Sequence, residues 1–584
     1  MLSYILYVDL TNKSVKIRRR AKLFSKYLGG TGVAIRLLLE ECPPNVDPFS
    51  PEAPIIVAAG PLTGLLPCCT KTVCMFKSPL TGNLGETHAG GRLASAIRFA
   101  GFGAIVIKGF ADKLTYLTIS DHNVSFHDAA ALKGQPPSET EKALRIPNVE
   151  GLQSVVSIGL AGEKLAWYAD ANVDMYNHFG RLGLGAIFAS KNLKAISITG
   201  TGEISAVNAD TLKLLYEDLY QEAEKKGGMK KYHDLGTMEN VLVLNELNAL
   251  PTKNFTSGKF DFAEDISGEA FAEKQMIRKI SCPGCPIACM HIAALKIPFA
   301  AQHEIGPIFL RYDYEPVYAL GSNLLIRDQN DVLKLILLAD EYGLDAMMLG
   351  TVLAWVTEAY EKGLISNSET LNVKPSWGDV ESYAQITENI VKMPNLFYTK
   401  LAQGVAAASE KYGGRDFAMA IGKNGLSGYL TGYASLLGTL VGARHSHNSN
   451  AGYSIDQESC KSSITYSEMV TKLIEEENWR CVQTSLVICL FARNIYTEEK
   501  VAEALKLVGI NRSVDDLKKL GGEIFQNQYK FKFREGFDFH KENLPNRIFE
   551  TPTMTGKLDK KMFTNMLASY ISKRFRRRGS EKEF

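Results

Sequence analysis

Three cysteines lie close together near the middle of the sequence, and thiolates are ligands for both iron–sulfur clusters and zinc. Cys282, Cys285 and Cys289 have the spacing C-x2-C-x3-C. Three thiolates at this spacing can bind three corners of one cubane, and the fourth ligand can come from a distant part of the chain. Cys460 and Cys489 are the candidates for that fourth ligand. The spacing therefore predicts a four-iron cluster.

A zinc site is the alternative, because C-x2-C also opens zinc knuckles. Zinc requires a fourth Cys or His nearby, and His291 lies only two positions after Cys289. We therefore favour a cluster over zinc. The ten cysteines are too few in 584 residues for a disulfide scaffold.

Four segments rich in glycine and basic residues have the composition of an anion-binding site. They are 77–82, 88–91, 178–185 and 190–195. Backbone amides at glycines, together with Lys and Arg, are the groups that bind a phosphate-bearing ligand. These segments match neither the Walker nor the dinucleotide fingerprint. They therefore indicate an anionic ligand without indicating a nucleotide.

Two further segments carry groups suited to acid–base or anion chemistry. In 340–345, Gly343 is expected to follow one helix and Asp345 to cap the next. In 444–447, two histidines stand at i and i+2, where they share a face of a strand but diverge in a helix. Arg444 beside them favours an anion or oxo-ligand site.

The elements that must position these residues change in character near residue 205. Short β-branched or alternating segments predict strands at 4–10, 15–18, 54–59, 72–77, 104–108, 114–119 and 195–199. Apolar residues at helical spacing predict helices at 209–226, 331–342, 347–362, 380–391, 401–412, 466–478 and 498–508, the first capped by Asn208. A β-rich third followed by a helical remainder indicates segregated domains.

Composition excludes several classes of protein. The hydrophobic fraction is 45% and the charged fraction 22%, which rules out global disorder. The net charge of +2 gives no electrostatic case for nucleic acid as a partner. No run of apolar residues is long enough for a membrane span. Asp9 interrupts the apolar N-terminus, which has no basic region, so we expect a cytoplasmic protein rather than a secreted one.

Taken together, the motifs resemble those of the aldehyde:ferredoxin oxidoreductases, tungsten enzymes with a bis-pterin cofactor. The resemblance covers nearly the whole chain. It begins with the opening strand that ends at Asp9-Leu10-Thr11. It continues, in the family's order, through 60–64, 77–82, 90–91, 180–185, 190–195, the C-x2-C-x3-C motif, 340–345 and 485–489.

The resemblance implies an α+β fold, in which a β-sandwich-like N-terminal cofactor domain is followed by two mainly α-helical domains. The implied domains are residues 1–203, residues 204–415 with three cluster cysteines, and residues 416–584 with the fourth. The last domain ends in a basic tail at 573–580.

The implied cofactors are a tungsten (or molybdenum) bis-pterin, one 4Fe-4S cluster and a magnesium ion that bridges the pterin phosphates. The family pattern makes Cys489, not Cys460, the fourth cluster ligand. By position, one side of the pterin cofactor would contact Lys71, His88, Gly90, Gly180 and Arg181. One pterin would contact Asp340, Leu344 and Asp345, and the remaining cofactor contacts would come from Arg444, Thr484 and Ile488.

The resemblance also implies catalytic residues. Glu315 matches the family's active-site glutamate, and His445 best matches its active-site histidine, with His447 as the alternative registration. Two tyrosines stand just before Glu315, and burial among such side chains would raise its pKa toward neutrality.

Four positions depart from the family pattern. Lys71 replaces an arginine and keeps the charge without the bidentate fork. His88 replaces an asparagine, and Thr484 replaces an aspartate that would contact the second pterin. Lys334 replaces a glutamate that helps to hold an interfacial iron in the founding homodimer. We therefore expect a divergent catalytic subunit that works with a separate iron–sulfur subunit.

The function implied is the oxidation of small aldehydes to carboxylic acids, with electrons passed to ferredoxin or to an iron–sulfur electron-transfer subunit. Two alternatives stay open at this point. One is a tungsten subunit that reduces a low-potential aromatic thioester. The other is a non-catalytic iron–sulfur relay protein.

Overall fold

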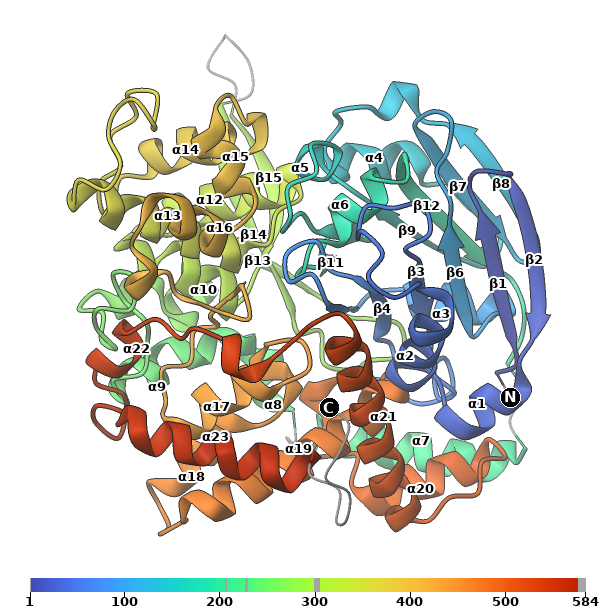
Figure 1. The fold of residues 1–584 in the computed structure, drawn as a ribbon. Coiled ribbons are helices and arrows are strands. Elements are labelled where there is room, and N and C mark those ends of the chain that lie inside the picture. The colour runs from blue at the N-terminus through green and yellow to red at the C-terminus, as the bar shows by residue number, and fades with distance from the viewer. Residues whose placement is uncertain (1, 205–206, 226–228, 299–304, 576–584) are drawn as a thin grey trace.

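The computed structural model describes residues 2–204, 207–225, 229–298 and 305–575. The predicted basic tail lies outside the described residues from position 576 onward. Figure 1 shows the strands of the N-terminal third gathered on one side of the molecule, with helices filling the other side and the base.

Two six-stranded sheets form the N-terminal third. The first has the order β2 (Ser14–Arg19), β1 (Tyr4–Asp9), β6 (Ala104–Lys108), β3 (Ile55–Ala58), β4 (Thr72–Lys77) and β5 (Leu84–Ala89). The second has the order β11 (Asn177–Phe179), β10 (Ala171–Val173), β9 (Leu152–Ser157), β12 (Leu193–Gly200), β7 (Thr115–Ser120) and β8 (Asn123–Asp128). Parallel pairs, β1 with β6 and β7 with β12, stand among antiparallel ones.

A core of buried apolar side chains joins the two sheets. Val57 and Ile105 of the first sheet belong to the same buried cluster as Val156 and Ile196 of the second. The predicted strands alternate or run apolar because one or both of their faces enter this core. The predicted sandwich-like domain is thereby confirmed. Its helices are α1 (Ala21–Tyr27), α2 (Gly30–Glu41), α3 (Leu93–Phe99), α4 (Pro137–Leu144), α5 (Leu160–Glu163) and α6 (Leu184–Ala189).

The rest of the chain is mainly helical, as predicted. The helices of its first half are α7 (Ala209–Glu224), α8 (Lys230–Asp234), α9 (Asn240–Glu246), α10 (Gly268–Lys274), α11 (Tyr314–Leu320), α12 (Gln329–Tyr342), α13 (Ala346–Glu361), α14 (Val380–Lys392), α15 (Leu396–Ala402) and α16 (Val405–Tyr412). Those of its second half are α17 (Tyr433–Val441), α18 (Gly452–Ser459), α19 (Tyr466–Ser485), α20 (Glu498–Leu507), α21 (Val514–Arg534), α22 (Arg547–Glu550) and α23 (Lys560–Phe575).

Local capping explains where several helices begin and end. The side chain of Asn208 accepts from the amide of Thr211 at 3.0 Å, as predicted for the start of α7. The predicted helix at 401–412 is instead two helices, α15 and α16. Gly404 separates them because it adopts a φ of 95°, which a helix interior does not allow.

Strands β13 (Met276–Ile280), β14 (Met290–Pro298) and β15 (Ile305–Tyr312) form an antiparallel sheet within the helical part. The sequence reasoning did not predict this sheet. It matters for the site because the cysteine motif lies in the connection between β13 and β14, and β15 leads directly to α11 and Glu315. A short hairpin, β16 (Ala420–Ile421) with β17 (Asn424–Gly425), completes the strands.

A close backbone contact holds the segment before Cys489 against the N-terminal domain. The amide of Gly32 donates to the hydroxyl of Ser485 at 2.9 Å. Gly30 has a φ of 33°, and a Cβ there would lie 2.2 Å from the carbonyl oxygen of Thr484. Only glycine permits this approach, which brings the end of α19 next to α2.

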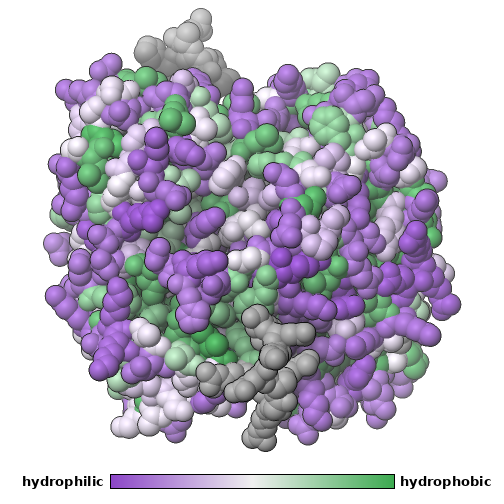
Figure 2. All heavy atoms as spheres, in the orientation of Figure 1, coloured by the Kyte–Doolittle hydropathy of each residue, from purple (hydrophilic) through white to green (hydrophobic). Residues whose placement is uncertain are grey.

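Hydrophilic and hydrophobic side chains are mixed on the face of the molecule drawn in Figure 2. Figure 2 shows a face covered mostly by hydrophilic residues, with hydrophobic residues in small groups between them. Within the described residues, no helix has both the length and the apolar composition needed to cross a membrane.

Candidate functional site

A cavity of about 330 Å³ lies where the sandwich meets the helical part. It brings together segments that are far apart in sequence. All the predicted cofactor-binding residues line it, namely Lys71, His88, Gly90, Gly180, Arg181, Asp340, Leu344, Asp345, Arg444, Thr484 and Ile488. Glu315, His447 and Cys489 line it as well. The predicted residues thus form one site rather than scattered turns.

Glu315 lies in the first turn of α11, where it meets two donors. Nε2 of His447 lies 3.3 Å from its Oε1, and the hydroxyl of Tyr429 donates to the same oxygen at 3.0 Å. Burial alone would raise the pKa of Glu315, but the hydrogen bonds from His447 and Tyr429 leave that pKa below its usual value. The expected rise toward neutrality is therefore not what the site produces, and Glu315 is a carboxylate at neutral pH.

His447 is buried and neutral. Desolvation lowers the pKa of its imidazole below the ordinary value, even though Glu315 acts to raise it. The contact with a carboxylate assigns the ring proton to Nε2, which leaves Nδ1 as an acceptor. Nδ1 has no hydrogen-bond partner among the described residues. The ring packs on Tyr429, with centroids 4.8 Å apart.

His445 does not line the cavity. Its Nε2 lies 2.8 Å from Nζ of Lys532, and its Nδ1 lies 3.3 Å from the carbonyl oxygen of Thr439. Its φ of 49° is a left-handed conformation, so the chain turns sharply between His445 and His447. The two rings therefore point to different environments, and His447, the alternative registration, is the histidine beside Glu315.

Asp340 and Asp170 flank the imidazole of His178. Nδ1 of His178 lies 3.0 Å from Oδ2 of Asp170, and Nε2 lies 3.7 Å from Oδ1 of Asp340. Burial would lower the pKa of His178, but the two carboxylates raise it to about 9. Desolvation raises the pKa of Asp340 to about 7. All three side chains line the cavity.

The two oxygens of Asp345 accept hydrogen bonds from three groups. Oδ1 accepts from the amides of Met347 and Met348 and so caps α13, as predicted. Oδ2 accepts from Nε of Arg181 at 3.0 Å. Arg181 also donates to the carbonyl oxygen of Gly425 at 2.7 Å. This carboxylate therefore orients Arg181 toward the cavity.

Several residues of the cavity were not found by sequence reasoning. Arg311 and Asp313 line it together with Glu315, so every second residue from 311 to 315 faces the cavity. The signal in the sequence is the alternation of polar and aromatic residues along 311–315, because tyrosines at 312 and 314 are buried on the other side. Glu86 lines the cavity from β5, and its Oε1 lies 2.8 Å from Nε2 of His88.

The cavity contains polar atoms whose hydrogen bonds are unmade within the described chain. Buried polar atoms of this kind need a ligand or water to bond to. They are Oδ1 of Asp170, Nη1 of Arg181, Nε of Arg311, Oδ1 of Asn424 and Nδ1 of His447. Donors and acceptors both occur among them. A polar ligand that carries both hydrogen-bond donors and acceptors therefore fits this lining.

The four predicted cluster cysteines lie near one another. Burial, followed by the neighbouring Cys489 and Cys282, raises the pKa of Cys289 to about 12. Cys285 and Cys282 likewise act with burial to raise the pKa of Cys489. Across the described ranges, no three Cys, His, Asp or Glu side chains are close enough to hold a single metal ion.

Two more contacts involve these cysteines. The amide of Gly91 donates to Sγ of Cys282 at 3.3 Å, and Sγ of Cys68 lies 3.6 Å from Sγ of Cys285. Cys460 is exposed where α18 ends. It does not take part in this group of thiols.

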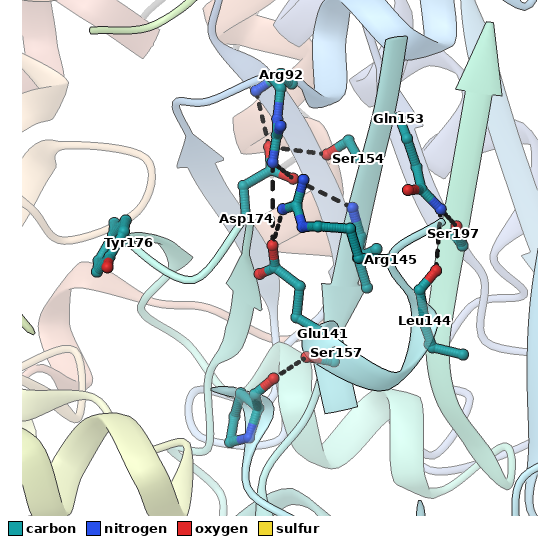
Figure 3. A network of polar contacts seen from close by, with 12 residues as sticks. Arg92, Glu141, Leu144, Arg145, Gln153, Ser154, Ser157, Asp174, Tyr176 and Ser197 are labelled. Atoms are coloured by element: carbon teal, nitrogen blue, oxygen red, sulfur yellow. Dashed lines mark hydrogen bonds and ion pairs between the residues drawn. The ribbon is translucent and has the colours of Figure 1, made fainter. Parts of the chain in front are cut away.

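A network of charged residues supports the turn at Gly91. Figure 3 shows the carboxylate of Asp174 facing Arg92 and Ser154, with Glu141 and Arg145 beside it. Asp174 accepts from the amide of Arg92 at 2.9 Å and from the hydroxyl of Ser154 at 3.0 Å. This network fixes the backbone next to the amide that meets Cys282.

Comparisons with known proteins agree with this architecture. The family model described as "Aldehyde ferredoxin oxidoreductase, N-terminal domain" matches residues 5–200, and that described as "Aldehyde ferredoxin oxidoreductase, domains 2 & 3" matches residues 214–582. The tungsten-containing aldehyde ferredoxin oxidoreductase of Pyrococcus furiosus is 32% identical over 573 residues, which cover 94% of this chain and 91% of the relative. Its namesake in Thermococcus kodakarensis is 33% identical over 575 residues, with 94% and 92% covered.

Two further proteins are similar to this chain, one in sequence and one in fold. The aliphatic sulfonate oxidoreductase, WOR-like subunit, of Pyrococcus furiosus is 28% identical over 427 residues, covering 70% of this chain and 66% of the relative. The active-site complex BamBC of benzoyl coenzyme A reductase, solved with 1,5-dienoyl-CoA, superposes with a TM-score of 0.84 at 21% identity. It covers 98% of this chain and 94% of that one. By the two family models and the identity to whole-length relatives, the chain belongs to the aldehyde ferredoxin oxidoreductase family.

Proposed function

We propose that this protein is a tungsten-dependent oxidoreductase that oxidises aldehydes to carboxylic acids. The observation that carries the proposal is the pairing of Glu315 with His447 in a cavity that Cys489 also lines. An acid–base pair beside a candidate cluster ligand is what a reaction that releases both protons and electrons requires. The names of the relatives at 32% and 33% identity support aldehydes as the substrate class.

The proposed cofactor is a bis-pterin with tungsten, or with molybdenum, and a magnesium ion on the pterin phosphates. The unpaired polar atoms of the cavity support this fit. Arg181 and Lys71 supply positive charge for phosphates, and Asp340 is an acceptor for pterin N–H groups. Thr484 is a weaker partner for the second pterin, because its hydroxyl already donates to the carbonyl oxygen of Arg480 at 2.8 Å. When bound, the metal centre supplies the two-electron oxidation.

In this proposal His447 is the catalytic base, rather than His445. The net reaction adds water to the aldehyde and yields the acid, two protons and two electrons. Nδ1 of His447 is free to accept one of those protons, while Glu315 holds Nε2 and stabilises the imidazolium that results. Tyr429 fixes the carboxylate of Glu315. His445 instead positions the turn that carries His447.

The electrons would leave through a four-iron cluster on Cys282, Cys285, Cys289 and Cys489. Cys489 lines the cavity and lies near Cys285 and Cys282, so it would connect the cluster to the cavity. The acceptor proposed is ferredoxin or an iron–sulfur subunit. In support of a separate subunit, Lys334 forms an ion pair with Glu381 and offers no carboxylate for an interfacial iron.

Metal analysis and turnover of anaerobically purified full-length protein test the proposal. Tungsten or molybdenum together with iron, and oxidation of small aldehydes coupled to reduction of ferredoxin, are the expected results. Iron without tungsten or molybdenum would favour the relay protein. Reduction of an aromatic thioester without aldehyde oxidation would favour the other alternative, and a full content of zinc in place of iron would contradict the cluster.

A further inference from the structure

Cys68 lies outside the proposed ligand set but touches it. Its side chain is fully buried, and its Sγ lies 3.6 Å from Sγ of Cys285. Its carbonyl oxygen accepts from the amide of Cys489 at 2.8 Å. Cys68 therefore contacts one proposed ligand through its thiol and another through its backbone.

The direction of the thiol contact follows from the roles of the two cysteines. A cluster ligand is a thiolate and carries no proton to donate. A thiol buried among apolar groups stays protonated, and Leu66 and Cys69 are buried neighbours of Cys68 in sequence. Sγ of Cys285 is then the acceptor, and Cys68 donates an S–H···S hydrogen bond to it.

We infer that Cys68 tunes the cluster, as a positioning residue that acts through Cys285. The inference rests on the proposed cluster. Reduction adds negative charge to the cluster and its sulfur ligands, so a hydrogen bond to a ligand sulfur stabilises the reduced form more than the oxidised form. The thiol of Cys68 therefore makes the reduction potential less negative than it would otherwise be.

A second donor of this kind comes from the backbone. The amide of Gly91 meets Sγ of Cys282 at 3.3 Å. A side-chain substitution at Cys68 leaves that amide in place. The contribution of Cys68 can thus be removed on its own, while the other sulfur-directed hydrogen bond is retained.

The test is an EPR-monitored redox titration of anaerobically purified full-length protein. Cys68→Ala removes the donor, and Cys68→Ser replaces it with a hydroxyl. All three residues meet the same backbone cost at this position, where φ is 60°. Cys69→Ala is the matched control, because the adjacent thiol is also fully buried but lies 3.3 Å from the hydroxyl of Tyr496 instead.

The expected result is a more negative midpoint potential in Cys68→Ala, recovery of most of that shift in Cys68→Ser, and no shift in Cys69→Ala. Iron content should be equal in all of them. An unchanged potential in Cys68→Ala at full iron content would overturn this inference alone. Loss of iron in that variant would also overturn it, because Cys68 would then be a ligand. If the wild-type protein contained no cluster, that result would contradict the proposed function as well as this inference.

Discussion

Lys532, a fully buried residue of α21, places its Nζ 2.8 Å from Nε2 of His445 and 3.0 Å from the carbonyl oxygen of Ala443. Both partners belong to the segment that brings Arg444 and His447 to the cavity. Helix α21 therefore supports the backbone turn behind the candidate active site, although Lys532 is not among the residues that line the cavity.

Replacing Lys532 by methionine should destabilise the protein by about 2–4 kcal/mol, because it leaves the oxygen of Ala443 and Nε2 of His445 buried without a donor. Denaturant unfolding of the cofactor-free protein measures this change. Lys530→Met, on the same helix at an exposed position, is the control and should have little effect. Equal stability of both variants would contradict the role of Lys532.

The two histidines should differ in what their removal changes. His447→Ala should lower turnover per bound tungsten by roughly 10²–10⁴-fold, the usual size of acid–base effects, with normal metal content. His445→Ala should lower the melting temperature, because Lys532 loses a partner, while the folded enzyme keeps far more of its turnover. The reverse pattern would mean that His445 is the catalytic histidine.

The acidic limb of the pH–rate profile should reflect the protonation of the His447 imidazole. A base acts only when deprotonated, so activity should fall as pH drops through its pKa, which lies below the ordinary histidine value of about 6.5. Glu315→Gln removes the charge that raises this pKa. The limb should therefore move to lower pH, and turnover should fall by roughly 10²–10⁴-fold. A limb that moves upward would exclude this pairing.

Substitution of Cys489 and substitution of Cys460 should have different effects on the iron content of the protein. Cys489→Ser should lose iron or perturb the EPR signal of the cluster. Cys460→Ser should change neither, because that thiol is exposed at the surface. Iron analysis together with EPR spectroscopy distinguishes the two, and loss of iron only in Cys460→Ser would reverse the assignment.

The imidazole of His178 should have an unusually high pKa in the cofactor-free protein. NMR of its ring should give a pKa of about 9, because Asp340 and Asp170 overcome the effect of burial. The ion pairs of protonated His178 therefore contribute to the free energy of unfolding. This contribution is fully present below about pH 6.5 and is lost as the pH rises through about 9. His178→Gln should therefore flatten the dependence of melting temperature on pH in that window. Identical profiles for wild type and variant would contradict it.

Strands and helices were predictable from the sequence because their signals are local. The strand at 72–77 and the helix at 380–391 follow from apolar patterning, and the start of α7 follows from the cap at Asn208. The family and the α+β fold are confirmed. The domain boundaries at 203 and 415 stay predictions.

The details of the site depend on contacts that no local pattern encodes. Which histidine faces Glu315 depends on a left-handed turn at His445 and on Lys532, far along the chain. The pKa of Glu315 was expected to rise from burial, but partners at positions 429 and 447 reverse the direction. Lys532 lies 85 positions after His447, and Tyr429 and His447 lie 114 and 132 positions after Glu315, so these contacts are not visible in a local stretch of sequence.

Cys489 follows Cys289 by 200 residues. At a synthesis rate of about 5–20 residues per second, Cys289 leaves the ribosome about 10–40 seconds before Cys489. During that interval a nascent chain presents an incomplete set of ligands to any metal in the cell. In the proposed function, insertion of the cluster would therefore follow translation, and a chain truncated before residue 489 would lack one of the four proposed ligands.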